Sequence, residues 1–382
     1  MTARVDALVL GVGGMGAAAL AHLASRGLRV LGVEQDDVPS LRGSSVGETR
    51  VIRKAYAEDP RYVPLLVRAY ELWRALEARS GQALFERVGC LNLGPEGHAA
   101  IRGVLESVAR HGLPHARLDP DEVRARFGIV PRTADVGVFE EDAGYLRVEA
   151  CTKAHADWAV ASGAGLRTRT RAVDLRIDPG SVHVTLDDGS TVVASHLVVA
   201  AGGWLPSLPA VGALVGHLPL VVERQVQLWF GTAPHGPARP PLPAFIHFLE
   251  DRAFYGIPAD PAHAHPAIKV CRHHGGESTS PDALDRSLRA DDEAQVRGYV
   301  RAHLPAADGP LLRSRVCMYT CTPDEHFVVG RLARAPHVVL LGGFSGHGYK
   351  MASVVGEIAA DLVEKGTSAF DLGMVAPERF AR

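Results

Sequence analysis

The first residues with chemical potential are three glycines near the start of the chain. Gly11, Gly13 and Gly16 form a GxGxxG pattern between an apolar run and an Ala/Leu-rich stretch. In such a pattern the first glycine permits a tight turn, the second lets a pyrophosphate touch the backbone, and the third lets a helix pack on a strand. Glu34 ends the next apolar run, where a carboxylate can accept both ribose hydroxyls. The pattern predicts a dinucleotide site; the acid disfavours NADP but does not separate NAD from FAD.

Reactive side chains also gather in longer segments. Three of them are GSSVGETRVIRKAY (43–56), VCMYTCTPDEHFVVG (316–330) and GFSGHGYKMASVVGE (343–357), and a fourth is AIKVCRHH (267–274). Arginine offers a planar fork for carboxylates, lysine a compact charge, and a thiolate is a nucleophile. Taken singly, these residues have ordinary alternatives. An arginine can form a surface salt bridge, and a free cysteine is most often a small buried apolar side chain.

The elements that must position these residues follow from periodicity. Residues 5–10 and 29–35 read as buried strands, with an Ala/Leu-rich helix between them that stops at Gly27. Further helices are expected at 60–79, 96–111, 148–162 and 281–304, and a last one after the glycine-rich turn at 345–350. Strands are expected within 165–200, with a hairpin turn at Asp188-Gly189, and at 337–344. Residues 232–266 are expected to form loops and strands over a site.

Composition excludes several classes of protein. The 382 residues are 47% hydrophobic and 22% charged, with a formal net charge of −2, so nothing points to nucleic acid or to a membrane surface. Five scattered cysteines do not suggest a disulfide framework, and their spacing predicts no metal site. No apolar run is long enough to cross a membrane and no signal peptide is recognisable. We therefore expect a cytoplasmic enzyme.

Together with the glycine pattern, the three longer segments resemble monomeric sarcosine oxidase and its relative N-methyltryptophan oxidase, within the D-amino-acid-oxidase-like flavoproteins. The likeness runs over almost the whole chain. It implies an α/β fold, in which a Rossmann-type FAD-binding domain is joined to an α+β substrate domain built on a mostly antiparallel sheet. We expect the FAD-binding domain to be discontinuous, over 1–85, 146–218 and 310–382, and the substrate domain to comprise 86–145 and 219–309.

The resemblance implies covalent FAD, attached through a thioether from Cys317 to the flavin 8α-methyl group. A thiolate can add to the electrophilic methylene of a flavin quinone methide, which would retain the cofactor. Cys321 is interpreted as a bystander. The predicted cofactor-binding residues are Gly11, Gly13, Gly16, Glu34, Ser44, Thr49, Val173, Gly202, Cys317, Gly346, His347, Gly348 and Lys350.

The resemblance also assigns roles around the substrate. Arg53 and Lys350 would bind its carboxylate, and Lys269 would promote the reaction of the reduced flavin with oxygen. The remaining catalytic residues it implies are Arg50, over the flavin ring, and the polar Tyr255 and His273. Val46 departs from the pattern, because a His commonly stands there in sarcosine oxidases.

The expected activity is oxidation of the C–N bond of a small secondary (N-methyl) amino acid to an imine, with O2 reduced to H2O2. If sarcosine is the substrate, the products are glycine and formaldehyde. Two alternatives remain open: a related oxidase or dehydrogenase acting on a cyclic imino acid or another amine, and a flavin-binding protein without activity. We expect a monomer or a small homo-oligomer, with no nucleic-acid or membrane partner.

Overall fold

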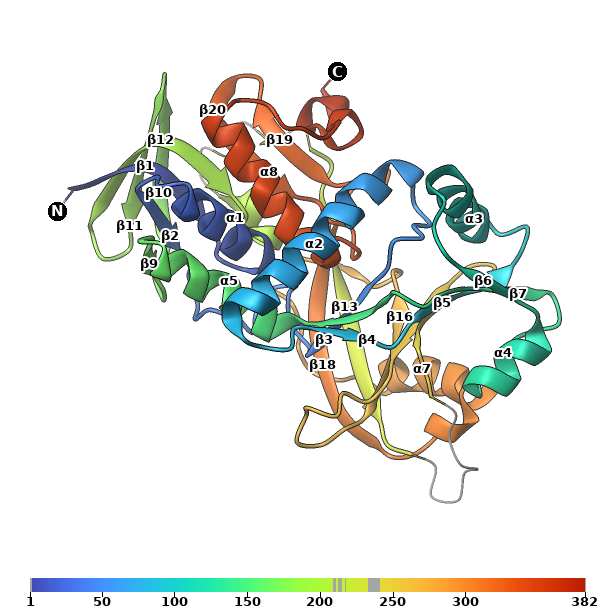
Figure 1. Cartoon of the computed structure of the whole chain (residues 1–382). Helices are drawn as coiled ribbons and strands as arrows, with labels where there is room; N and C mark the ends of the chain where they lie inside the picture. The colour runs from blue at the N-terminus through green and yellow to red at the C-terminus, as the bar shows by residue number, and fades with distance from the viewer. Residues whose placement is uncertain (1, 209–210, 212–214, 217, 233–240, 382) are drawn as a thin grey trace.

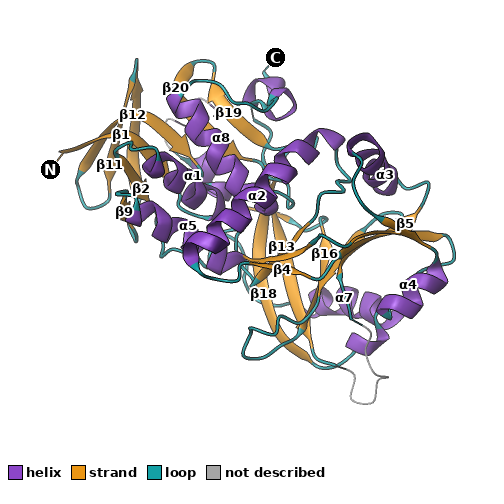
Figure 2. Ribbon diagram, viewed as in Figure 1, coloured by secondary structure: helices purple, strands orange, loops and turns teal. Residues whose placement is uncertain are grey.

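The chain forms two lobes, each built around its own sheet (Figure 1). The computed structural model describes residues 2–208, 211, 215–216, 218–232 and 241–381. Helices cover one face of the first sheet, and in the second lobe helices lie on both sides of the sheet (Figure 2). This mixture of a parallel and an antiparallel sheet confirms the predicted fold class.

The first sheet is parallel at its centre, because β1 pairs in parallel with both β2 and β12. In spatial order it contains β10 (Ala172–Asp178), β11 (Ser181–Leu186), β12 (Thr191–Val199), β1 (Thr2–Leu10), β2 (Val30–Val33) and β9 (Gly165–Arg167). The later half of β12 also pairs with β20 (Ala335–Gly342), which in turn pairs with β19 (Val328–Leu332). The predicted strand pattern and the Asp188-Gly189 hairpin are confirmed, with Gly189 at φ +77.

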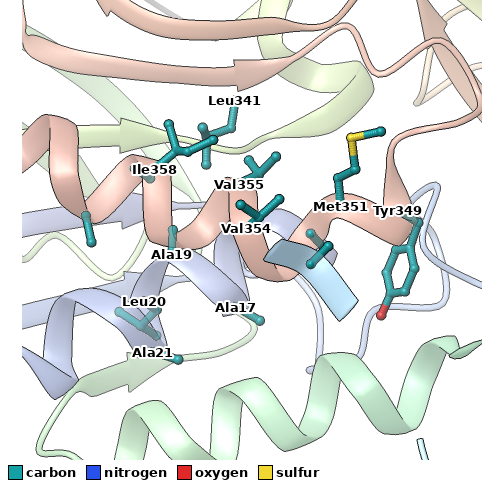
Figure 3. Packing of buried hydrophobic residues seen from close by; sticks show 14 of the residues in the cluster. Ala17, Ala19, Leu20, Ala21, Leu341, Tyr349, Met351, Val354, Val355 and Ile358 are labelled. Carbon is teal, nitrogen blue, oxygen red and sulfur yellow. The ribbon is translucent and has the colours of Figure 1, made fainter. Parts of the chain in front are cut away.

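Three helices pack on this sheet and on one another: α1 (Gly14–Ser25), α5 (Val148–Ala161) and α8 (Ala352–Glu364) (Figure 1). In Figure 3, Val355 and Ile358 of α8 lie on the side of that helix nearest Leu341 of β20, and α1 with Ala19 lies on the opposite side. The contact between these helices is close at Gly356, where a Cβ would lie 2.5 Å from the carbonyl carbon of Ala18. The residues that position the start of α8 are therefore tied to α1.

The other predicted helices are found with shifted ends. The short helix Pro60–Tyr62 leads into α2 (Val63–Ser80), and α3 spans Ala99–His111. The helical spacing of apolar residues over 60–79 predicts Val67 on the apolar face of this helix, together with Leu66 and Tyr70. That prediction was wrong for Val67, which is 44% exposed.

The helix predicted over 281–304 is α7 (Ala290–His303), so the prediction was wrong for 281–289. Asp285 binds the backbone N–H of Ser287, a local turn that competes with helix. The backbone N–H of Arg289 then donates to the carboxylate of Asp292, and the helix begins there.

The second sheet is antiparallel except where β5 and β14 pair in parallel. In spatial order it contains β17 (Ser278–Thr279), β13 (Val221–Phe230), β16 (Ile268–His273), β15 (Ala253–Ile257), β14 (Ala244–Phe248), β5 (Cys90–Pro95), β7 (Asp135–Glu140) and β6 (Ala116–Leu118), and β18 (Leu311–Cys321) pairs with β13. Residues 232–266 thus supply β14 and β15, as expected, although 233–240 lie outside the described residues. Helix α4 (Pro120–Phe127) also belongs to this lobe.

The strand β18 crosses between the lobes. Its residues fall in the range assigned from sequence to the FAD-binding domain, yet they hydrogen-bond along most of β13 in the second sheet. A small third sheet of β3 (Thr49–Ile52), β8 (Gly144–Arg147) and β4 (Phe85–Arg87) lies beside them. The domain boundaries themselves stay a prediction. No helix among the described residues is long and apolar enough to span a membrane.

Candidate active site

A cavity of about 710 Å³ runs along the carboxyl ends of β1, β2 and β12, and we call it the large cavity. Open α/β sheets bind their ligands at this edge. The predicted cofactor-binding residues that line it are Gly11, Gly13, Glu34, Ser44, Val173, Gly202, Gly346 and Gly348. Sequence reasoning missed other lining residues, among them Arg171, Asp187, Trp204 and Asp282.

One end of the large cavity is built by the glycine turn. Gly11 has φ +84, and a Cβ at Gly16 would lie 1.8 Å from the carbonyl oxygen of Gly11, which is the helix-on-strand packing that the sequence predicted. Gly13 caps α1 without a side-chain hydrogen bond, so the first N–H groups of the helix can bind an anion. Glu34 accepts the backbone N–H of Val12 at 2.8 Å, which fixes its carboxylate beside the turn.

The other end is lined by charged and aromatic side chains. Arg50 lies there, and its guanidinium donates two hydrogen bonds. One goes to the backbone carbonyl of Thr49 at 2.9 Å and the other to the backbone carbonyl of Ser44 at 2.8 Å. With the amide of Gln227 oriented to accept, its oxygen lies 3.1–3.2 Å from both terminal nitrogens of Arg50. Gly346 has φ +76, and a Cβ there would lie 2.3 Å from the ring of Tyr319, so glycine suits this position on both counts. The hydrogen bonds of Arg50 hold a cation at this end of the cavity.

A smaller cavity of about 70 Å³, the small cavity, adjoins this end. Both cavities are lined by Arg50, Tyr319, Gly346 and Tyr349, so a ligand in one can touch a ligand in the other. The small cavity alone is lined by Val51, Arg53, Glu58, Ile246, Phe248, Tyr255, His273, His347 and Lys350. The structure therefore gathers four segments, distant in sequence, around one small space.

Two buried cations face the small cavity. Arg53 is 2% exposed and donates one hydrogen bond to the carbonyl of Ala55, while its Nε has no hydrogen-bond partner among the described residues. Lys350 donates to the carbonyl of His347, and burial, followed by the charge of Arg53, lowers its pKa to about 7. Unsatisfied donors in a buried site favour an anionic ligand.

The local framework around these cations is rigid. Trp73 of α2 donates its ring N–H to the carbonyl of Lys350 at 2.8 Å. The carboxylate of Glu140 accepts the backbone N–H groups of Lys54 and Ala55, directly after Arg53. Both loops are thereby held by groups that lie in other elements.

Glu58, which sequence reasoning missed, places a carboxylate in the same cavity. Its Oε2 lies 3.6 Å from Nη2 of Arg53 and has no hydrogen-bond partner within the described part of the chain. Burial opposes its charge, but His347, Arg53 and Lys350 outweigh burial and lower its pKa to about 2. Glu58 follows the 43–56 segment by two residues, and that proximity was the only sequence signal for it.

Histidines and tyrosines form the other walls. His347 lies in the small cavity, not in the large one, and its Nδ1 contacts the hydroxyl of Tyr56 at 2.5 Å. His273 Nδ1 lies 3.3 Å from the hydroxyl of Tyr319, and the ring of Tyr255 meets His273 edge-on. Burial lowers the pKa of His347 to about 4 and that of His273 well below its usual value, so both rings are neutral at pH 7.

Four predicted site residues do not line either cavity: Gly16, which packs helix on strand, and Thr49, Lys269 and Cys317. Thr49 contributes its carbonyl to Arg50 and Lys269. Lys269 is 1% exposed and donates to the carbonyls of Gly47 and Thr49 at 2.9 Å each; burial, then the charge of Arg50, lowers its pKa to about 8. Cys317 is fully buried, and Arg50 and Lys269 partly oppose the rise that burial causes in its pKa. Thr49, Lys269 and Cys317 form a layer behind Arg50.

The large cavity suits a flavin dinucleotide. Gly13 has open space where a Cβ would stand, and the anion-binding helix start lies between the acid at one end and the cation at the other. Cys317 lies two residues before Tyr319 on β18, so strand alternation directs both side chains to the same face. A thiol is thus next to the wall of the aromatic end.

Comparisons with known proteins agree with this geometry. The family model described as FAD dependent oxidoreductase matches residues 6–362. The chain is 36% identical over 393 residues to monomeric sarcosine oxidase of Streptomyces avermitilis, covering 100% of this chain and 99% of that protein. N-methyl-L-tryptophan oxidase of Yersinia pestis is 33% identical over 380 residues, covering 98% and 99%. The structure of NikD, described as an unusual amino acid oxidase essential for nikkomycin biosynthesis, has a TM-score of 0.85 at 25% identity and covers 98% of each chain.

Proposed function

The chain belongs to the FAD dependent oxidoreductase family, and from this premise we propose that it oxidises small secondary (N-methyl) amino acids to imines, using O2 as electron acceptor and forming H2O2. The observation that carries the proposal is the small cavity, with two buried cations, beside the aromatic end of the large cavity. The site residues and their roles below are part of this proposal.

The cofactor is FAD, as in the rest of the family. We propose that the turn at Gly11 and Gly13 holds its pyrophosphate, Glu34 its ribose, and Arg50 with Gly346 its flavin end. When bound, the flavin accepts a hydride equivalent from a C–H bond next to nitrogen and passes two electrons to O2. Attachment through Cys317 is supported by the position of this thiol on the same strand face as Tyr319.

The substrate carboxylate would accept hydrogen bonds from the Nε–H group of Arg53, unpaired among the described residues, and from the ammonium of Lys350. A water-sized group needs roughly 10–15 Å³, so a cavity of about 70 Å³ holds about six non-hydrogen atoms, which is the size of sarcosine. Val51, Ile246 and Phe248 line the apolar part of the small cavity. The geometry thus favours a small amino acid.

The amine must lose its proton before oxidation. Arg50 and Arg53 both line the small cavity and repel an ammonium, which favours the neutral amine. His273 and Tyr255 are neutral at pH 7 and orient the nitrogen by hydrogen bonding. Lys269, a buried cation in the layer behind Arg50, would favour the negative charge that develops when O2 takes up an electron.

An anaerobic screen tests the proposal. The purified flavoprotein is mixed without oxygen with sarcosine, other N-methyl amino acids, cyclic imino acids and primary amino acids, and flavin bleaching is recorded. We expect rapid bleaching with sarcosine-sized secondary amino acids, followed by stoichiometric H2O2 when air is admitted. Bleaching only by primary amines, or re-oxidation too slow to support turnover, would overturn the proposal.

A further inference from the structure

Three polar side chains from three different segments meet near Tyr319. They are Glu223 of β13, Cys321 of β18 and His274, which directly follows β16, and we call them the Cys321 cluster. One ligand atom of each lies within 4.8 Å of the others. Sequence spacing gave Cys321 no ligand partner, because the other two residues lie 47 or more positions away and only the pairing of the strands brings them together.

The chemistry of the cluster is that of a transition-metal site. Thiolate, imidazole and carboxylate are the donors that Zn²⁺ uses, at about 2.0–2.3 Å each, so that tetrahedral ligand atoms stand roughly 3.3–3.8 Å apart. Nδ1 of His274 lies 3.9 Å from Oε2 of Glu223, and small side-chain movements close the remaining gap. Three protein ligands would leave a fourth position open for water.

The surroundings favour a cation as well. Glu223 is oriented by the side-chain amide of Gln225 at 3.1 Å, as second-layer groups orient metal ligands elsewhere. The carboxylate of Glu223 also places negative charge beside the Cys321 thiol, and this charge attracts a metal ion. The side chains of His274 and Glu223 are 24% and 21% exposed, so an ion can enter from solvent.

We propose that Glu223, His274 and Cys321 bind one Zn²⁺-class metal ion, with water as fourth ligand and loss of the Cys321 proton to solvent. The site is separate from the large and small cavities, because none of its ligands lines either of them.

A bound metal would act on the neighbouring active site. His274 adjoins His273, which faces the small cavity. The ring of His274 lies 5.4 Å from the ring of Tyr319, and Tyr319 lines both cavities. His274 also has φ +60, a conformation that Asn tolerates as well as His. Fixing His274 on a metal would therefore shift His273 and Tyr319, and we expect substrate binding to weaken.

Equilibrium dialysis of the flavin-containing protein against Zn²⁺, with excess Mg²⁺ present, tests the binding. We expect one more equivalent of zinc on the wild type than on Cys321→Ser or on His274→Asn, and full binding by the control Glu325→Gln, which removes a nearby charge but no ligand. Flavin absorbance checks that each variant is folded. Equal zinc binding by the wild type and both ligand variants would overturn the site, whatever the enzyme's substrate.

Steady-state kinetics tests the coupling. Zinc at a concentration that fills the site should raise KM several-fold with kcat retained in the wild type, and should leave Cys321→Ser unchanged. An unchanged wild-type KM at full occupancy would refute the link to the active site.

Discussion

At the scale of single residues, Glu58 affects how Arg53 binds a substrate carboxylate. Without a substrate, the carboxylate of Glu58 is the nearest counter-ion of this buried guanidinium, at 3.6 Å, and a substrate carboxylate would compete with it. A buried charge that loses its partner is costly, so each of the two groups keeps the other ionised. Arg53 therefore stays charged in the empty cavity and can bind an anion.

Replacing Arg53 tests the carboxylate site. Arg53→Gln removes a charge-assisted hydrogen bond of about 1.5–3 kcal/mol, so we expect kcat/KM for sarcosine to fall roughly 10- to 100-fold, mostly through KM. The variant also leaves Glu58 without its partner and should be less stable. Arg53→Gln/Glu58→Gln should recover stability, measured by thermal melting, without recovering KM. A normal KM in either variant would contradict the assignment.

Lys350 should make anion binding depend on pH. Its pKa of about 7 means that it is charged below pH 7 and loses its charge above it. We expect the Kd of an amine-free ligand such as methoxyacetate, followed by flavin absorbance, to be constant below pH 7 and to rise above it, by at most about tenfold per pH unit. Lys350→Gln should abolish this rise. If the Kd of Lys350→Gln still rises near pH 8, the rise reports the titration of Lys269. If Lys350→Gln has the same pH profile of the Kd as the wild type, Lys350 does not belong to the site.

At the scale of elements, the packing of α1 on α8 fixes the positions of the residues at or just before the start of each helix, and these residues line the two cavities. α1 begins at the pyrophosphate end and α8 begins two residues after Lys350, and the two helices are in tight contact at Gly356 and Ala18. A longer side chain between them must move one helix start or the other.

Gly356→Ala is the corresponding test. Its Cβ would lie within 2.6 Å of Ala18, so we expect a loss of about 1–3 kcal/mol in the free energy of unfolding and weaker flavin retention. The matched control is Gly298→Ala in the exposed middle of α7, where a Cβ meets nothing within 4 Å. That change should stabilise by up to about 1 kcal/mol, through helix propensity. Urea unfolding measures the free energy of unfolding of both variants. Equal changes in Gly356→Ala and Gly298→Ala would contradict the packing argument.

Elements built on local signals could be predicted from sequence. The glycine turn, the apolar strands beside it and the Asp188-Gly189 hairpin depend on residues within a few positions of one another. The start of α7 could not, because the preference of Asp285 for a local turn competes with the helical pattern over 281–289. Val67 shows the same weakness, since periodicity does not tell which flank of an apolar stripe is covered.

At the scale of the whole molecule, the site is a meeting of distant segments. Eight of the predicted cofactor residues line the large cavity, and they could be proposed from sequence because they occur in contiguous motifs. Glu58 could not, since it meets Arg53 and His347 only in the folded chain, and the Cys321 cluster exists only after β13, β16 and β18 align. Within the range 310–382 predicted for the FAD-binding domain, β18 pairs with β13 of the second sheet and leads into β19 of the first.

The large cavity lies between elements from both ends of the chain, so the cofactor should stabilise the whole fold. In the wild type we expect flavin to stay with acid-precipitated protein, because we propose that Cys317 binds it covalently. Cys317→Ser should release it, and the resulting apoprotein should melt several degrees lower. Added FAD at one hundred times its Kd should restore about 2.7 kcal/mol, by mass action. Cys321→Ser should keep the flavin attached, which separates the two thiols on β18. Free release of flavin by denatured wild type would exclude the thioether, whereas an FAD-independent melting point in Cys317→Ser would show that the cavity is stable without its cofactor.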